Sequence, residues 1–143
     1  MTRPSDMLRS LLGWGDPVVE VEVVTARGST PREAGARMLV TGSATFGTVG
    51  GGRLEWEAIA RARALLQSGE AGARLEIPLG PAVGQCCGGH VVLALRRADD
   101  AVLADLTAAE AAADAMKPVV LLFGAGHVGQ ALAAALSPLP LRV

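Results

Sequence analysis

The chain has 143 residues, and its 13 Lys and Arg against 14 Asp and Glu leave a formal net charge of −1. This balance argues against a general nucleic-acid binder, which normally carries a basic excess. With 50% hydrophobic and 3% aromatic residues, the chain is neither disordered nor equipped with the aromatic platforms that stack bases or sugars.

The N-terminal part predicts a mixture of helices and strands. Ser5 is placed to cap a short helix that runs to Trp14. The segment 18–26 predicts a strand with one hydrated side, because Glu20 and Glu22 alternate with valines. Further along, the pattern predicts a loop at 28–35, a hairpin of 37–41 and 44–48, a helix at 53–68 that ends at Gly69, and strands at 74–77 and 91–95. We therefore interpret residues 1–97 as an α+β domain.

The C-terminal part has a different composition. Residues 98–117 are Ala-rich and acidic and predict a helical connector on the surface. Residues 118–141 carry no Asp, Glu, Lys or Arg, but glycines and prolines interrupt this stretch, which argues against a membrane span. A Val/Leu run, a glycine turn and an Ala/Leu helix are typical of a buried parallel strand with its crossover helix. We therefore expect residues 118–143 to be the first βα unit of a truncated Rossmann-like α/β domain.

This unit contains the glycine pattern of dinucleotide-binding turns. Gly124, Gly126 and Gly129 form a GxGxxG motif between the predicted strand 119–123 and a helix. The acidic residue that binds the ribose would follow about 20 residues later. Because the sequence ends at Val143, where the second strand would begin, NAD(P) binding here is not favoured.

Three consecutive glycines, Gly50, Gly51 and Gly52, precede the predicted helix at 53–68. Bare backbone N–H groups and the positive end of the helix dipole favour an anion such as a phosphate at this turn. A tight turn that needs a positive φ is the simpler alternative. Glu55 lies on the apolar side of the first helical turn, which indicates either a ligand or a structural hydrogen-bond role.

The only two cysteines, Cys86 and Cys87, are adjacent, so they cannot form a disulfide framework. They lie in an uncharged, glycine-rich loop, where thiols are accessible and backbone N–H groups can lower their pKa values. Together with His90 they supply at most three zinc ligands, and no base is placed to activate a thiol. The loop therefore indicates either thiolate contact with a soft metal or cofactor, or a sulfur relay.

The N-terminus contains no signal-peptide pattern, because Arg3, Asp6 and Arg9 interrupt any apolar run. The cysteine usage does not require an oxidising compartment. Both observations favour a cytoplasmic location.

Three segments resemble the XdhC/CoxI family of xanthine dehydrogenase accessory proteins. They are residues 27–38 (RGSTPREAGARM), 47–55 (GTVGGGRLE) and 79–89 (LGPAVGQCCGG). Residues 123–129 (FGAGHVG) resemble the start of that family's C-terminal Rossmann domain. The resemblance covers the chain from about Val18 onward and is carried by several independent motifs in the same order.

The resemblance implies a cytoplasmic chaperone, not an enzyme, that binds the molybdenum cofactor (molybdopterin). It would hold the cofactor while a cysteine desulfurase provides the terminal sulfido ligand, and would then deliver it to a molybdenum hydroxylase such as xanthine dehydrogenase. Cys86 and Cys87 would contact the molybdenum, and Gln85 and Gly88 would shape their loop. Gly50 to Gly52 and Glu55 would line the same pocket. We also expect a homo-oligomer.

Two other functions compete with this one. An NAD(P)-dependent oxidoreductase with a catalytic loop thiol would rest on the GxGxxG motif, but its domain is incomplete and no base is placed beside the thiol. A structural or interaction module would leave both cysteines inert.

Overall fold

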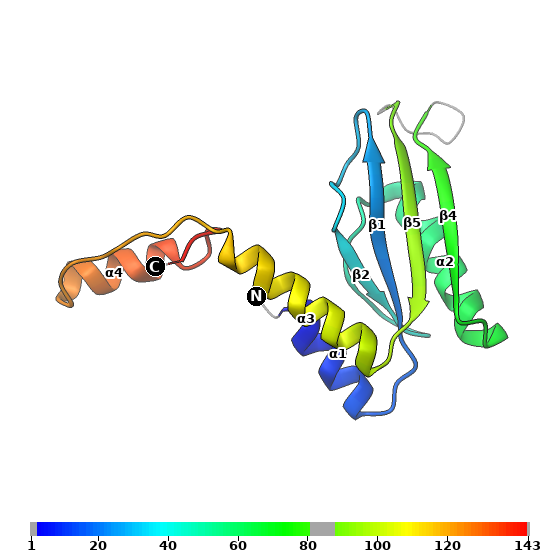
Figure 1. The fold of residues 1–143 in the computed structure, drawn as a ribbon, viewed down its shortest axis with the longest axis horizontal. Coiled ribbons are helices and arrows are strands. Elements are labelled where there is room, and N and C mark those ends of the chain that lie inside the picture. The colour runs from blue at the N-terminus through cyan, green and yellow to red at the C-terminus, as the bar shows by residue number, and fades with distance from the viewer. Residues whose placement is uncertain (1–2, 81–87, 143) are drawn as a thin grey trace. The chain divides into compact units, whose positions relative to one another are not determined.

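A computed structural model describes residues 3–80 and 88–142 of the chain (Figure 1). These residues divide into two compact units, Met1–Ala104 and Asp105–Val143. The first unit contains all the strands, and the second contains most of α3 together with α4.

The first unit is built on one antiparallel sheet with the strand order β3-β2-β1-β5-β4. Every neighbouring pair is antiparallel, and a short turn connects β2 to β3. α2 connects β3, at one end of this order, to β4 at the other. The α+β prediction is therefore confirmed for this part of the chain. The strands are β1 (Val19–Arg27), β2 (Arg37–Val40), β3 (Thr45–Gly47), β4 (Gly72–Pro78) and β5 (His90–Arg97).

The helices lie close to the predicted segments. They are α1 (Pro4–Gly13), α2 (Gly52–Ser68), α3 (Asp100–Ala115) and α4 (His127–Leu136). The prediction that Ser5 caps α1 was wrong, because the cap position is Arg3 and Ser5 is buried inside the helix. Pro4 explains the earlier start, since proline fits the first helical position, where the backbone N–H has no partner. Gly69 ends α2 in the left-handed conformation, as predicted.

The main hydrophobic core lies between α2 and one face of the sheet. Alternate residues of β1 (Val19, Val21 and Val23) point to this face and are fully buried. The helix contributes one apolar stripe, formed by Leu54, Ala58, Ala62 and Leu65. This packing fixes α2 against the sheet and so determines where the glycine turn that begins α2 is held.

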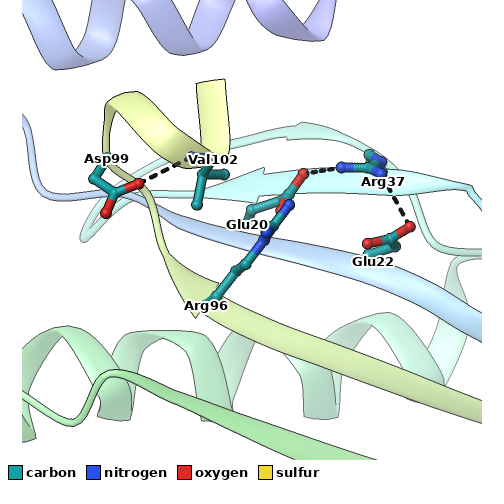
Figure 2. Close-up of polar contacts among 6 residues, drawn as sticks. All are labelled: Glu20, Glu22, Arg37, Arg96, Asp99 and Val102. Carbon is teal, nitrogen blue, oxygen red and sulfur yellow. Dashed lines mark hydrogen bonds and ion pairs between the residues drawn. The ribbon is translucent and has the colours of Figure 1, made fainter. Parts of the chain in front are cut away.

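The sequence predicts that the opposite face of β1 is hydrated. In the structure this face instead carries a buried ion-pair network (Figure 2). The side chain of Glu20 is 0% exposed; its Oε1 lies 2.5 Å from Arg37 Nη1 and its Oε2 lies 2.6 Å from Arg96 Nε. Arg37 also contacts Glu22, with Nη2 and Oε1 3.0 Å apart. Two arginines from the neighbouring strands thus neutralise the charge of the buried carboxylate. The alternation of Glu and Val therefore does not indicate a hydrated face here.

The second unit differs from the predicted βα unit. α4 forms after the glycine motif, but residues 119–123 do not form a strand. Val119 makes one isolated parallel bridge with Arg142, and none of the described residues from 107 to 142 is buried. A parallel strand is stabilised by neighbours and by cover on both faces, and the described part of this unit supplies neither.

None of the helices in the described residues is both long and apolar enough to cross a membrane.

The Glu20 network generates a stability prediction. Glu20→Gln leaves Arg37 and Arg96 without their buried carboxylate, so we expect it to lower the free energy of unfolding by about 3 kcal/mol. Urea denaturation followed by circular dichroism measures this loss. Glu22→Gln is the matched control on the same strand, because that side chain is 24% exposed, and should cost about 1 kcal/mol or less. Equal losses in the two variants would contradict the account.

Candidate functional site

The three segments that carry the sequence motifs meet at one end of the sheet. β1 and β4 end there, at Arg27 and Pro78, and β5 begins there at His90. The strand register places Arg27 and Pro78 on either side of His90 (Figure 1). The antiparallel pairing therefore brings together residues as distant in the sequence as Arg27 and His90.

The loop after β1 contacts the chain just before β5. Ser29 and Gly88 form a parallel bridge, and the backbone of Gly28 lies close to the Cα of Gly89. A side chain at Gly89 would collide with the carbonyl oxygens of Arg27 and Ser29, so this crossing requires glycine. The first and third motif segments are thus held together by their backbones.

The same loop also contacts the glycine turn that precedes α2. Pro31 packs directly on Gly50, whose φ is +133°, and a Cβ at Gly50 would overlap the Pro31 ring. The first and second motif segments therefore meet through this contact. The structure explains Gly50 as a position of close backbone approach, which a tight turn alone would not require.

Glu55 holds the glycine turn from inside. Its Oε2 accepts hydrogen bonds from the Thr48 hydroxyl, from Val49 N at 3.2 Å and from Gly51 N at 3.1 Å. The Gly50 amide donates to Thr48 Oγ1 at 3.1 Å. The carboxylate of the chain itself thus occupies the inner side of the turn, which is the structural hydrogen-bond role considered for Glu55.

The pKa of Glu55 reflects this environment. Burial raises the pKa, but the hydrogen bonds from Thr48, Gly51, Val49 and Gly50 outweigh burial, and the net effect is a pKa below the usual value of 4.5. Glu55 is therefore ionised near neutral pH and keeps the turn in one conformation. A carboxylate engaged in this way organises the site, and it is not free to contact an anionic ligand.

The outer side of the turn presents bare backbone. Gly51 is the N-cap of α2 with a φ of 74°, and no side chain caps this helix. No heavy atom of the described residues lies near the position of a Cβ at Gly51 or at Gly88, apart from their chain neighbours. The N–H groups of the first helical residues, from Gly52 to Leu54, have no acceptor inside the helix. They combine with the helix dipole to favour a negatively charged group.

Arg27 and His90 were not selected from the sequence as site residues. They are direct cross-strand neighbours at this end of the sheet. Arg27 is exposed and makes no ion pair with another residue in the described part of the chain. A cation beside the crossing loops adds to the attraction for an anion. Only the register of β1 and β5 could have located this pair, and the sequence alone does not reveal that register.

The remaining candidates are placed as follows. Gln85, Cys86 and Cys87 lie outside the described residues, so the thiol prediction is untested. In residues 3–80 and 88–142, no three His, Asp, Glu or Cys side chains are grouped to hold a metal ion. Gly124, Gly126 and Gly129 belong to the second unit, where Gly126 is the N-cap of α4. Gly129 approaches the carbonyl of Gly124 too closely to allow a side chain.

A family match covers the first two of the three motif segments. Residues 11–78 match the family model of the XdhC and CoxI family. The uncharacterized protein YqeB of Escherichia coli (strain K12) is 28% identical over 120 residues, which cover 82% of this chain and 19% of YqeB. The crystal structure of a xanthine dehydrogenase from Bacillus halodurans has the same fold, with a TM-score of 0.62 and 23% identity over 81% of this chain and 36% of that chain. The chain thus spans less than half of either relative.

The Glu55 hydrogen bonds generate a pH prediction. The pKa of Glu55 is lower in the folded state than its ordinary value of 4.5. Its contribution to the free energy of unfolding is therefore fully present at pH values above 4.5, and it is lost as the pH falls through the folded-state pKa. Glu55→Gln should lower the free energy of unfolding by about 1–2 kcal/mol at neutral pH and should reduce the acid-dependent loss. Urea denaturation over a pH series measures both effects. Glu57→Gln, which removes an ion pair with Arg53 on the same helix, should retain the wild-type acid-dependent loss.

The Pro31 contact generates a second stability prediction. Gly50→Ala strains a positive φ and also forces the Pro31 ring away, whereas Gly51→Ala strains φ in open space. We expect Gly51→Ala to cost about 1 kcal/mol and Gly50→Ala at least about 2 kcal/mol. Thermal or urea unfolding of the two variants measures the difference. A loss for Gly50→Ala no larger than that for Gly51→Ala would show that Pro31 does not pack on the turn.

Proposed function

Because residues 11–78 of this chain match the model of the XdhC and CoxI family, we propose that the chain holds the molybdenum cofactor during maturation of a molybdenum hydroxylase such as xanthine dehydrogenase. The observation that carries the proposal is the meeting of the 28–31 loop, the glycine turn and Gly88 at one end of the sheet. Each of the three comes from a different motif segment, and the three segments are separate in the sequence.

The chemistry of the described residues fits the cofactor. The start of α2 offers backbone N–H groups to the phosphate of molybdopterin, and Arg27 adds a positive charge at the same end of the sheet. The open backbone at Gly51 and Gly88 leaves room for a flat, polar pterin to form hydrogen bonds with main-chain groups. Glu55 acts as a positioning residue, because it fixes the turn without using the outward-facing amides.

The thiols complete the proposed site. Cys87 directly precedes Gly88 in the sequence, and Gly88 forms the bridge with Ser29. We propose that Cys86 and Cys87 offer thiolates to the molybdenum, which accepts soft sulfur ligands, and that Gln85 shapes their loop. The bound cargo would receive its sulfido ligand from a cysteine desulfurase and then pass to the apoenzyme. In this role the chain is a carrier and performs no redox reaction itself.

The second unit carries a separate proposal about the fold. We infer that residues 118–142 belong to the start of a parallel β-α-β arrangement. The parallel bridge between Val119 and Arg142 supports this inference, because α4 lies between the two bridged residues in the sequence. Hydrogen bonds from Val120 N to Arg142 O (2.7 Å) and from Arg142 N to Pro118 O (2.9 Å) follow the same parallel pattern.

An NAD(P)-dependent oxidoreductase receives less support from the described residues. The close approach of Gly129 to Gly124 fits a dinucleotide turn. The family match over residues 11–78 favours the cofactor-holding role instead.

The decisive test is copurification of the cofactor. We expect protein purified from cells that make molybdenum cofactor to carry molybdenum and a pterin, which is detected by the fluorescence of its oxidised form. The Cys86→Ala/Cys87→Ala variant should lose both signals, down to the background of wild-type protein from cells that cannot make the cofactor. Equal background signals in the wild-type and variant proteins would refute the proposal. Circular dichroism establishes that the variant is folded.

A further inference from the structure

We propose that β4 is a self-association edge, at which two copies of this chain pair antiparallel around Leu75 and join their sheets. This inference is independent of the cofactor proposal. It rests on the backbone and charges of β4 alone.

β4 is the last strand of the sheet in the described part of the chain, next to β5 (Figure 1). Its pairing with β5 determines which backbone groups point outward. Leu79 N donates to Gly89 O at 2.7 Å, and Arg97 N donates to Ala71 O at 3.0 Å. In an antiparallel pair such bonds recur at every second residue, so the odd-numbered residues of β4 bond to β5. The even-numbered residues Gly72, Arg74 and Glu76 direct their N–H and C=O groups to the open edge.

The charges on this edge are self-complementary in one register. A second copy must align its outward-directed residues with those of the first, and the registers centred on Arg74, Leu75 or Glu76 pair the longest stretch of β4. A centre at Arg74 or at Glu76 places like charges directly opposite each other. A centre at Leu75 places Arg74 of each copy opposite Glu76 of the other. Opposite charges in directly facing positions stabilise a strand pair, and like charges destabilise it.

The exposure of these side chains suits an interface. Arg74 and Glu76 are 62% and 63% exposed, and within one chain their Nε and Oε1 atoms are 3.7 Å apart, a loose contact. Cross-strand pairing would replace this contact with a closer one on each side of the two-fold axis. Leu75 is only partly buried against the core, so a facing Leu75 would cover its remaining surface. Pro78 lacks an N–H group and ends the pairing at the end of the strand.

Charged residues on an edge strand often prevent association. On β4, however, the two charges have opposite signs and are two residues apart, which is the spacing that an antiparallel two-fold register pairs. Charge complementarity therefore favours a second copy of the chain over a partner strand of unrelated sequence.

Light scattering coupled to gel filtration tests the proposal over a range of concentrations. We expect the wild-type chain to reach twice the monomer mass of 14.5 kDa as its concentration rises. Arg74→Glu and Glu76→Arg should each lose this doubling, because like charges then face each other. The double variant Arg74→Glu/Glu76→Arg should regain it. Arg9→Glu, at an arginine on α1 that is 57% exposed, is the control and should behave as wild type.

A mixing experiment separates pairing from a general effect of charge. Arg74→Glu and Glu76→Arg chains should each remain monomeric alone and should form a complex of twice the monomer mass when mixed in equal amounts. A wild-type chain that stays monomeric at every concentration would overturn the proposal. Dimers that persist in both single variants, or a mixture that stays monomeric, would overturn it as well. Circular dichroism before mixing establishes that both variants are folded.

Discussion

The candidate site depends on the hydrogen bonds that Glu55 forms with the turn before α2. Three backbone amides in a row would otherwise be free to rotate, because glycines restrict the backbone least. The carboxylate accepts hydrogen bonds from Val49 N and Gly51 N, and Thr48 bridges the carboxylate and the Gly50 amide. One ionised side chain thus sets the conformation of the turn, while the core under α2 sets its position on the sheet.

This arrangement gives Glu55 and the three glycines different roles, although the sequence suggested ligand contact for both. The triple glycine and Glu55 were both candidates for direct ligand contact, and the structure divides them between the inner and the outer side of the turn. Glu55 satisfies the inner amides, so the first amides of α2 remain directed outward. Pro31 then seats the 28–31 loop on Gly50, and Ser29 bridges to Gly88. A ligand at this end of the sheet would meet backbone that is already ordered, which lowers the entropic cost of binding.

The sequence predicted most of the fold, and its failures have physical causes. Apolar periodicity and Gly69 located α2 to within one residue. The hydrated face assigned to Glu20 was wrong, because the arginines that pair with it lie 17 and 76 residues away and only the strand register brings them together. For the same reason the sequence could identify the motifs of the site but not the contacts between them, nor the proximity of Arg27 and His90. Residues 119–123 have strand composition, but a strand also needs neighbours, which composition does not provide.

The central claim is that one ligand, the molybdenum cofactor, is held where these three segments meet. Hydrogen–deuterium exchange with and without purified cofactor tests it directly, because backbone amides carry much of the proposed contact. The account predicts slower exchange in three separate peptides at once, covering residues 28–31, 50–54 and 88–89, with little change along α1. Protection confined to residues 118–130, or no protection at all in the presence of bound cofactor, would contradict it.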